Sequence, residues 1–161
     1  MEVRRVPMEQ LGPLLEEQLC HGCARLPVTG SSMLPTLRQG RDVVRLVPME
    51  CMPENGAIIL YRRDNGQYVL HRLIRMEDGK TGLCCGDNQW ERELVPREQM
   101  IAVADGVWRK GTWIDWKTNR RFLCYQWLWT KLFPVRRPII AVRRIAGHLR
   151  QSVNTSRREA V

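Results

Sequence analysis

Short apolar runs alternate with turn-forming residues across most of the chain. From residue 26 to residue 116, runs rich in Val, Ile and Leu are separated by clusters of Gly, Pro, Asn and Asp. This pattern is typical of strands joined by short turns, and Asp64-Asn65-Gly66 has the composition of a hairpin turn. We therefore predict a mainly β protein built on a compact antiparallel β-domain. The predicted strands are 26–30, 42–48, 57–62, 67–76, 80–85, 100–108 and 111–116.

Apolar residues at helical spacing flank this region on both sides. In residues 8–20, four leucines form one stripe. We expect this short helix to begin near Pro13, because proline is tolerated in a first turn. Residues 122–133 predict a second helix and residues 139–149 a third. The chain is expected to contain three parts: a helical segment at 1–25, a β-rich domain at 26–117 and a basic, aromatic, helical tail at 118–161.

Charge is divided unevenly between these parts. The 161 residues carry a net charge of +9, yet residues 1–115 hold 15 Lys and Arg against 16 Asp and Glu. Residues 116–161 hold 11 Lys and Arg and a single acid, so an anionic partner is expected to meet the tail. Two interpretations stay open: residues 118–150 contact an anionic membrane peripherally, or they pack their aromatic side chains on the β-domain. No specific nucleic-acid partner is expected.

Length and cysteine content set further bounds. The longest charge-free stretch, residues 122–130, is far shorter than the roughly 20 apolar residues of a spanning helix, and no signal peptide is evident. We expect a cytoplasmic protein, with peripheral membrane association as an alternative, and six reduced cysteines. Cys20 and Cys23 have the spacing of half a zinc site or of a redox pair, but a second half is lacking. No metal or cofactor is therefore expected, and the role of this pair is left open.

Three short segments carry candidate chemistry. His71 lies in the middle of a predicted strand, where alternation places it and Arg72 on opposite faces. A lone histidine on an apolar strand face is usually a hydrogen-bonded core residue, so it needs a partner before it indicates catalysis. The segment from Gly30 to Pro35 combines small residues with a stiff exit, which suits a nucleophilic hydroxyl beside backbone N–H donors. A third segment, Gly86-Asp87-Asn88, follows the strand at 80–85.

In this order, Gly-x-Ser-Met-x-Pro-Thr-Leu, a strand with His-Arg, and Gly-Asp-Asn resemble the motifs of signal peptidase I and LexA-like serine peptidases. The resemblance covers about residues 26–107. It implies a β-domain of the LexA and signal-peptidase type and a serine endopeptidase that removes a leader or signal-like segment from a peptide or preprotein. Ser32, directly before the methionine, would be the nucleophile. His71 would be the base, as in the endoplasmic-reticulum and archaeal-type branch, and Asp87 the orienting acid.

The same resemblance assigns the oxyanion and substrate-binding segment to Gly30, Ser31, Met33 and Pro35. Because Gly30 stands where many signal peptidases have serine, the oxyanion hole is expected to rest on backbone N–H groups. Glu93 is a second candidate for the acid that orients the histidine.

Three further expectations concern the binding of the substrate, the pH dependence of activity and an alternative function. The substrate is expected to add as a strand beside residues 28–32 or 57–62. A histidine base predicts activity that rises near its ordinary pKa of about 6.5. The alternative function is that of a non-catalytic peptide-binding or membrane-associated member of the same fold.

Overall fold

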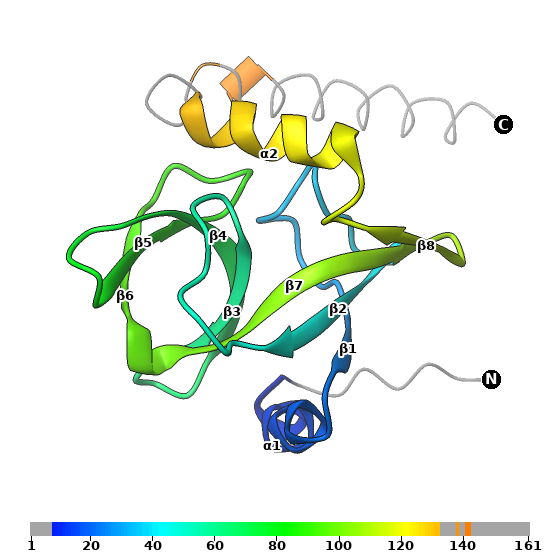
Figure 1. Ribbon diagram of the computed structural model, residues 1–161, viewed down its shortest axis with the longest axis vertical. Helices are drawn as coiled ribbons and strands as arrows, with labels where there is room; N and C mark the ends of the chain where they lie inside the picture. The colour runs from blue at the N-terminus through cyan, green and yellow to red at the C-terminus, as the bar shows by residue number, and fades with distance from the viewer. Residues whose placement is uncertain (1–7, 133–137, 139–140, 143–161) are drawn as a thin grey trace, which may run out of the picture. The chain divides into compact units, whose positions relative to one another are not determined.

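The computed structural model describes residues 8–132, 138 and 141–142. Within this range, eight antiparallel strands form one sheet that curls on itself, as Figure 1 shows. The strand order is β1-β2-β7-β3-β4-β5-β6, and β8 pairs with β7. The strands are β1 (Ala24–Pro27), β2 (Asp42–Pro48), β3 (Ile58–Arg62), β4 (Tyr68–Met76), β5 (Thr81–Cys85), β6 (Glu93–Pro96), β7 (Met100–Arg109) and β8 (Thr112–Asp115). The helices are α1 (Met8–Cys20), the 3₁₀ helix η1 (Arg97–Gln99) and α2 (Arg120–Lys131).

The prediction of a mainly β fold with a short N-terminal helix is confirmed. Six of the seven predicted strands are present, but the strand predicted at 26–30 lies at Ala24–Pro27, and residues 28–30 are not in a strand. The pattern missed β6, which has only four residues and ends in proline, so its apolar signal is too short to register. The expectation that residues 57–62 offer an edge for substrate is wrong. β3 is paired on both sides, with β4 and with β7, and therefore has no free edge.

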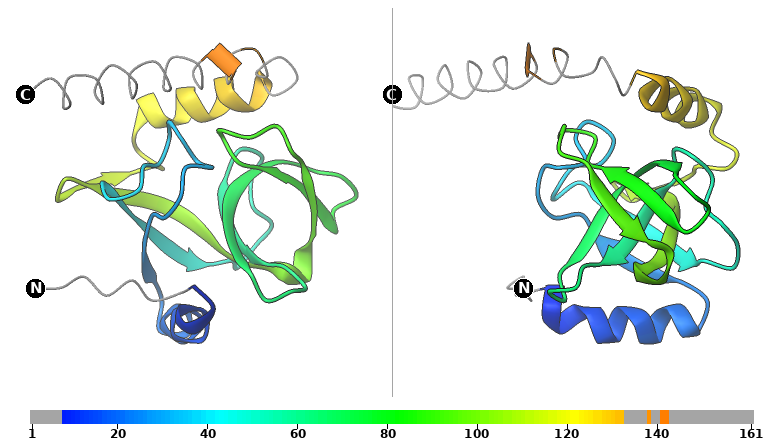
Figure 2. Two further views of the ribbon diagram at one scale, coloured as in Figure 1. Left: turned by 180° about the vertical axis from the view of Figure 1, so that it is seen from behind. Right: turned by 90° about the vertical axis from the view of Figure 1, so that its left-hand side faces the viewer.

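α1 lies at one end of the curled sheet and α2 at the other (Figure 2). The prediction that α1 begins near Pro13 is wrong, since the helix starts at Met8 and contains the proline. Pro13 lacks the N–H that would continue the backbone hydrogen-bond ladder. Burial of Leu15 and Leu19 in the core beside β1 offsets this loss.

α2 begins two residues before the predicted position. Asn119 caps it, because its side-chain oxygen accepts a hydrogen bond from the Phe122 N–H at 3.0 Å. The Phe122 ring stacks on Trp116 with ring centroids 4.2 Å apart, and Trp129 is buried. The interpretation that the tail packs aromatic side chains on the β-domain therefore applies to this helix.

The chain divides into two compact units, residues 1–130 and 131–161. The predicted boundaries at 25/26 and 117/118 remain predictions. In the second unit, Lys131, Pro138, Ala141 and Val142 have helical backbone. The remainder of the helix predicted at 139–149 lies outside the described residues.

A buried ion pair joins three segments of the first unit. Arg72 of β4 donates to both carboxylate oxygens of Asp87, with both distances 2.7 Å, and neither side chain has any exposed surface. Arg72 also donates to the Gly56 carbonyl at 2.7 Å, and the Thr36 hydroxyl donates to Asp87. The ion pair therefore ties the loops around residues 36, 56 and 87 to one strand.

Replacing Asp87 by alanine is expected to cost on the order of 3–5 kcal/mol of unfolding free energy, because it leaves the Arg72 guanidinium buried without its partner. The matched control is Glu77→Ala, which removes an ion pair with Arg75 whose side chains are 37% and 58% exposed. That change is expected to cost about 0–1 kcal/mol. Urea unfolding followed by circular dichroism measures both. Equal losses in the two variants would contradict the assigned role of the buried pair.

Candidate functional site

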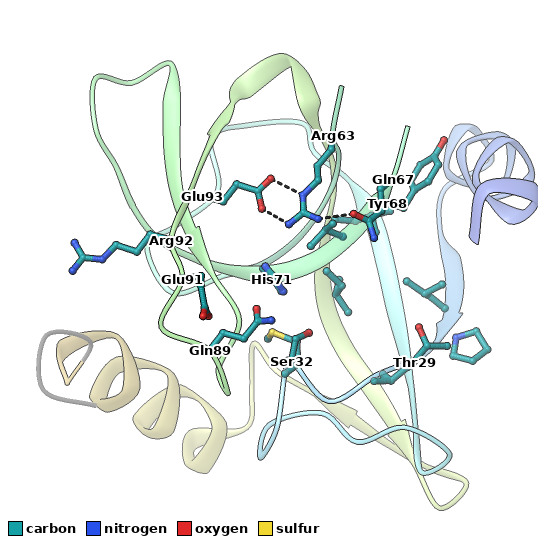
Figure 3. A pocket seen from close by; sticks show the side chains of 17 residues that line it. Thr29, Ser32, Arg63, Gln67, Tyr68, His71, Gln89, Glu91, Arg92 and Glu93 are labelled. Carbon is teal, nitrogen blue, oxygen red and sulfur yellow. Dashed lines mark hydrogen bonds and ion pairs between the residues drawn. The ribbon is translucent and has the colours of Figure 1, made fainter. Parts of the chain in front are cut away.

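Ser32 and His71 line the same cavity, which has a volume of about 590 Å³. Its walls come from β1 and the loop after it, from the first half of β4, and from residues 89–93 before and at the start of β6. In Figure 3 the His71 ring projects from β4 into this cavity above the loop that carries Ser32, and Gln89 lies beside them. The structure therefore brings together two residues that are 39 positions apart in the sequence. Among the described residues, no hydrogen bond joins their side chains.

The loop that carries Ser32 is anchored to the third predicted segment. The Asn88 N–H donates to the Ser32 carbonyl at 2.7 Å. A Cβ at Gly86 would lie 2.8 Å from the same carbonyl oxygen, so only glycine allows this approach. Met33, the next residue, is buried in the core and lines the cavity. Gly86 and Asn88 thus position the candidate nucleophile through its own backbone.

The other residues of this loop have different environments. Ser31 is exposed, whereas Ser32 is half-buried and belongs to the cavity wall. The Gly30 N–H donates to the side-chain oxygen of Gln39 at 3.0 Å, so it is already engaged. Pro35 is exposed and follows a cis peptide bond. Among the described residues, the N–H groups of Ser31 and Ser32 have no acceptor, which leaves them available to a ligand.

His71 is connected to an acid through a tyrosine. Its Nδ1 lies 3.2 Å from the hydroxyl of Tyr61 on β3, and that hydroxyl donates to Glu93 at 2.8 Å. Arg63 holds Glu93 in turn, with Nε–Oε1 and Nη2–Oε2 distances of 2.7 and 2.6 Å. The hydrogen bonds from Arg63 are the largest cause that keeps the pKa of Glu93 below its ordinary value. Glu93 is therefore an anion at neutral pH.

This chain of hydrogen bonds selects one tautomer of the imidazole. The single hydroxyl proton of Tyr61 goes to the carboxylate of Glu93, the stronger acceptor. The Tyr61 oxygen can then only accept from His71, so Nδ1 must carry the ring proton. Nε2 keeps its lone pair, and among the described residues it has no hydrogen-bond partner. A histidine in this state can accept a proton at Nε2.

Burial changes the basicity of His71. The side chain is 8% exposed, and loss of solvation is the largest cause that lowers its pKa to about 4. The nearby positive charge of Arg63 lowers the pKa further, while the carboxylates of Glu93 and Asp87 raise it. The pKa of His71 in the folded chain therefore lies below the ordinary histidine value on which the expected activity midpoint is based. His71 is neutral throughout the physiological range.

The two candidate acids have separate surroundings. Both oxygens of Asp87 are engaged by Arg72, and one also accepts from Thr36. Glu93 is linked to His71 through the hydroxyl of Tyr61. Asp87 therefore belongs to the buried framework, whereas Nδ1 of His71 is hydrogen-bonded to Tyr61, which donates to Glu93.

Tyr61 and Arg63 were not predicted as site residues, although the sequence contains a signal that points to Tyr61. The turn at 64–66 pairs Arg62 with Tyr68, and the register then places Ile59 opposite His71. Residues two apart on a strand share a face, so Tyr61 is the diagonal neighbour of His71. The hairpin register alone could have indicated this contact. The approach of Glu93 from β6 could not be predicted, because that strand was missed.

The described residues also show the state of the cysteines, the grouping of possible metal ligands and the character of the helices. The six cysteines are free thiols, and burial raises the pKa of Cys84 to about 12. Among the described residues, no three His, Cys, Asp or Glu side chains gather as metal ligands would. None of the helices in the described part of the chain has the length and apolar character needed to cross a membrane.

Comparison with protein-family models gives no match for this chain, and a search of curated proteins gives none either. The interpretation of the cavity therefore rests on its residues and their geometry.

Stability is expected to fall as the pH drops from about 6.5 to about 4. In this window the unfolded chain protonates His71 at its ordinary pKa of 6.5, whereas the folded chain, with a pKa of about 4, does not. The unfolded state binds the extra proton, so acid favours unfolding, by on the order of 3 kcal/mol at full effect. Chemical denaturation of wild type and His71→Asn at pH 7 and pH 4 measures this loss.

The His71→Asn variant is expected to lose less stability on acidification than wild type. The matched control is His21→Asn, which changes an exposed histidine and is expected to keep the wild-type pH dependence. Identical pH dependence in wild type and His71→Asn would contradict the burial of a neutral His71.

Proposed function

We propose that this chain is a serine endopeptidase of the signal peptidase I and LexA-like group, which removes a leader or signal-like segment from a peptide or protein. One observation carries the proposal. Ser32 and His71 line one cavity, and His71 is hydrogen-bonded through Tyr61 to the anionic Glu93. The resemblance of the three sequence segments to that group supports it independently.

In the proposed reaction, Ser32 Oγ attacks the carbonyl carbon of a peptide bond while its proton passes to Nε2 of His71. The tetrahedral intermediate collapses, the C–N bond breaks, and His71 returns the proton to the leaving amine. Water then hydrolyses the ester on Ser32, with His71 again taking and returning one proton. The nucleophile and the base of an enzyme are often not hydrogen-bonded before substrate binds. Substrate binding is expected to shorten the distance between Ser32 Oγ and His71 Nε2.

Tyr61 and Glu93 act on the charge that forms during this transfer. When Nε2 is protonated, the ring becomes an imidazolium that still donates from Nδ1 to the Tyr61 oxygen. The carboxylate of Glu93 stabilises the positive charge, since it raises the pKa of His71. This role corresponds to that of the acid in a Ser-His-Asp triad, with a phenol interposed. Tyr61 and Glu93 are therefore positioning residues.

The loop supplies donors for the oxyanion. The unengaged N–H groups of Ser31 and Ser32 lie beside the nucleophile, as an oxyanion hole requires. Gly30 contributes conformational freedom, with a φ of 74°, while its N–H is used by Gln39. The proposed hole thus consists of backbone groups, in keeping with the glycine at position 30.

A free sheet edge borders the cavity on the substrate side. Among the described residues, β1 lies at the end of the strand order and pairs with β2 alone. Its residues Leu26 and Pro27 line the cavity with Val28 and Thr29. An extended peptide can pair with this edge and place its scissile bond near Ser32. We propose this edge, in place of residues 57–62, as the substrate-binding strand.

Cleavage of a proteome-derived peptide mixture, read by mass spectrometry, tests the proposal. Wild type is expected to cleave a subset of the peptides, and Ser32→Ala and His71→Asn to lose roughly 10³-fold or more in rate. Thr112→Ala is the control, because it removes an exposed hydroxyl on β8 that does not line the cavity, and it is expected to stay active. The activity of wild type is expected to be retained well below pH 6.5.

Two outcomes would contradict the proposal. Cleavage that persists in Ser32→Ala would show that another group, or a contaminant, is responsible. Peptides that bind wild type and are not cut would favour the non-catalytic peptide-binding member of the fold. The absence of a Ser32–His71 hydrogen bond among the described residues is the observation that favours this second function.

A further inference from the structure

The exposed face of α2 carries large apolar side chains beside basic ones. Leu123, Trp127 and Leu128 are 43%, 62% and 45% exposed. Leu123 and Trp127 are four residues apart, so they are neighbours on one side of the helix, whereas Leu128 lies further around its exposed side. A helix on the surface of a protein ordinarily turns its polar side to water. α2 instead presents large apolar side chains there.

The inward face of the same helix packs on the β-domain. Phe122 stacks on Trp116, Trp129 is buried, and the hydroxyls of Tyr125 and Thr36 are hydrogen-bonded at 3.2 Å. These contacts fix how the helix is rotated about its axis. Leu123, Trp127 and Leu128 therefore stay exposed to solvent when α2 packs on the β-domain.

The apolar surface continues onto a neighbouring loop. Met52, in the loop between β2 and β3, is 43% exposed. Met52, Phe122 and Leu123 line one cavity of about 710 Å³, so the loop and the helix are adjacent. We call Met52, Leu123, Trp127 and Leu128 the α2 surface.

Positive charge accompanies the α2 surface. Arg120 and Arg121 are exposed in the first turn of α2, where the helix dipole disfavours cations and no acidic residue compensates. Helix stability therefore does not explain why two arginines occupy the first turn of α2. Glu50 and Glu54 lie in the loop with Met52, but residues 116–161 carry 11 Lys and Arg against one acid. The sequence from residue 116 onward therefore has a strong net positive charge.

We propose that the α2 surface docks onto an anionic lipid bilayer. Leucine, methionine and tryptophan side chains enter the boundary between headgroups and acyl chains, and the arginines contact the anionic headgroups. Charge complementarity favours this partner over a neutral apolar protein surface. The inference does not depend on peptidase activity.

The docked helix is connected to the candidate active site. Thr36, which is hydrogen-bonded to Tyr125 of α2, lies four residues after Ser32 in the same loop. The Thr36 hydroxyl also donates to Asp87, so α2 shares the buried framework of the site. Docking through α2 would hold the peptidase domain at the bilayer surface.

Flotation of the full chain with vesicles tests the inference. Wild type is expected to float with equimolar phosphatidylcholine and phosphatidylglycerol, and much less with phosphatidylcholine alone. The double variant Trp127→Ala/Leu128→Ala is expected to lower the partition coefficient on anionic vesicles by on the order of tenfold or more. Both side chains are exposed, so the fold is retained. Arg120→Gln/Arg121→Gln is expected to weaken binding to anionic vesicles specifically.

The matched control is Leu94→Ala, which removes a side chain on β6 that is 62% exposed, as much as Trp127. It is expected to leave vesicle binding unchanged. Three results would overturn the inference: no binding of wild type to anionic vesicles, equal binding of wild type and the Trp127/Leu128 variant, or equal binding to both kinds of vesicle. A dimer in solution that this variant dissociates would assign the α2 surface to a second copy instead.

Discussion

Arg72 and Asp87 meet without any exposed surface on either side chain, and the site depends on the position they fix. Burying two charges is expensive, so the pair persists only because their hydrogen bonds are satisfied. Gly56 and Thr36 supply those further bonds. Asn88, the residue after Asp87, donates its N–H to the Ser32 carbonyl. His71 is the residue before Arg72 in β4. One buried interaction therefore sets the relative position of the candidate nucleophile and base.

In the proposed peptidase, the two acids of the site share the roles that one acid has in a Ser-His-Asp triad. Asp87 holds the framework from inside, and Glu93 acts on His71 from outside through the Tyr61 hydroxyl. This separation follows from strand alternation, because His71 and Arg72 project to opposite faces of β4. Glu93 keeps its charge because Arg63 pairs with it at the rim of the cavity. The imidazole of His71 is therefore buried and neutral. Its orientation is fixed by Tyr61, without direct contact with a carboxylate.

Much of this arrangement could be predicted from the sequence, and the limits have physical causes. Apolar alternation and turn residues were sufficient for six strands, and motif order was sufficient for the placement of Ser32 and His71 in one cavity. The partner of Arg72 was not predictable, because a charged residue inside a strand gives no sign of what will bury it. Both faces of α2 carry aromatic or aliphatic residues, so sequence periodicity could not separate the packed face from the exposed one.

The most direct test of the account is the protonation of the two ring nitrogens of His71. Long-range ¹H–¹⁵N correlation spectra of the full chain at neutral pH distinguish the tautomers, and the His71→Asn variant assigns the signals among three histidines. A neutral ring protonated at Nδ1 is expected in wild type, and a shift toward a mixture of tautomers in Tyr61→Phe, which lacks the accepting hydroxyl. A wild-type ring protonated at Nε2 would contradict it, because the nitrogen facing the cavity could then not take the proton of Ser32.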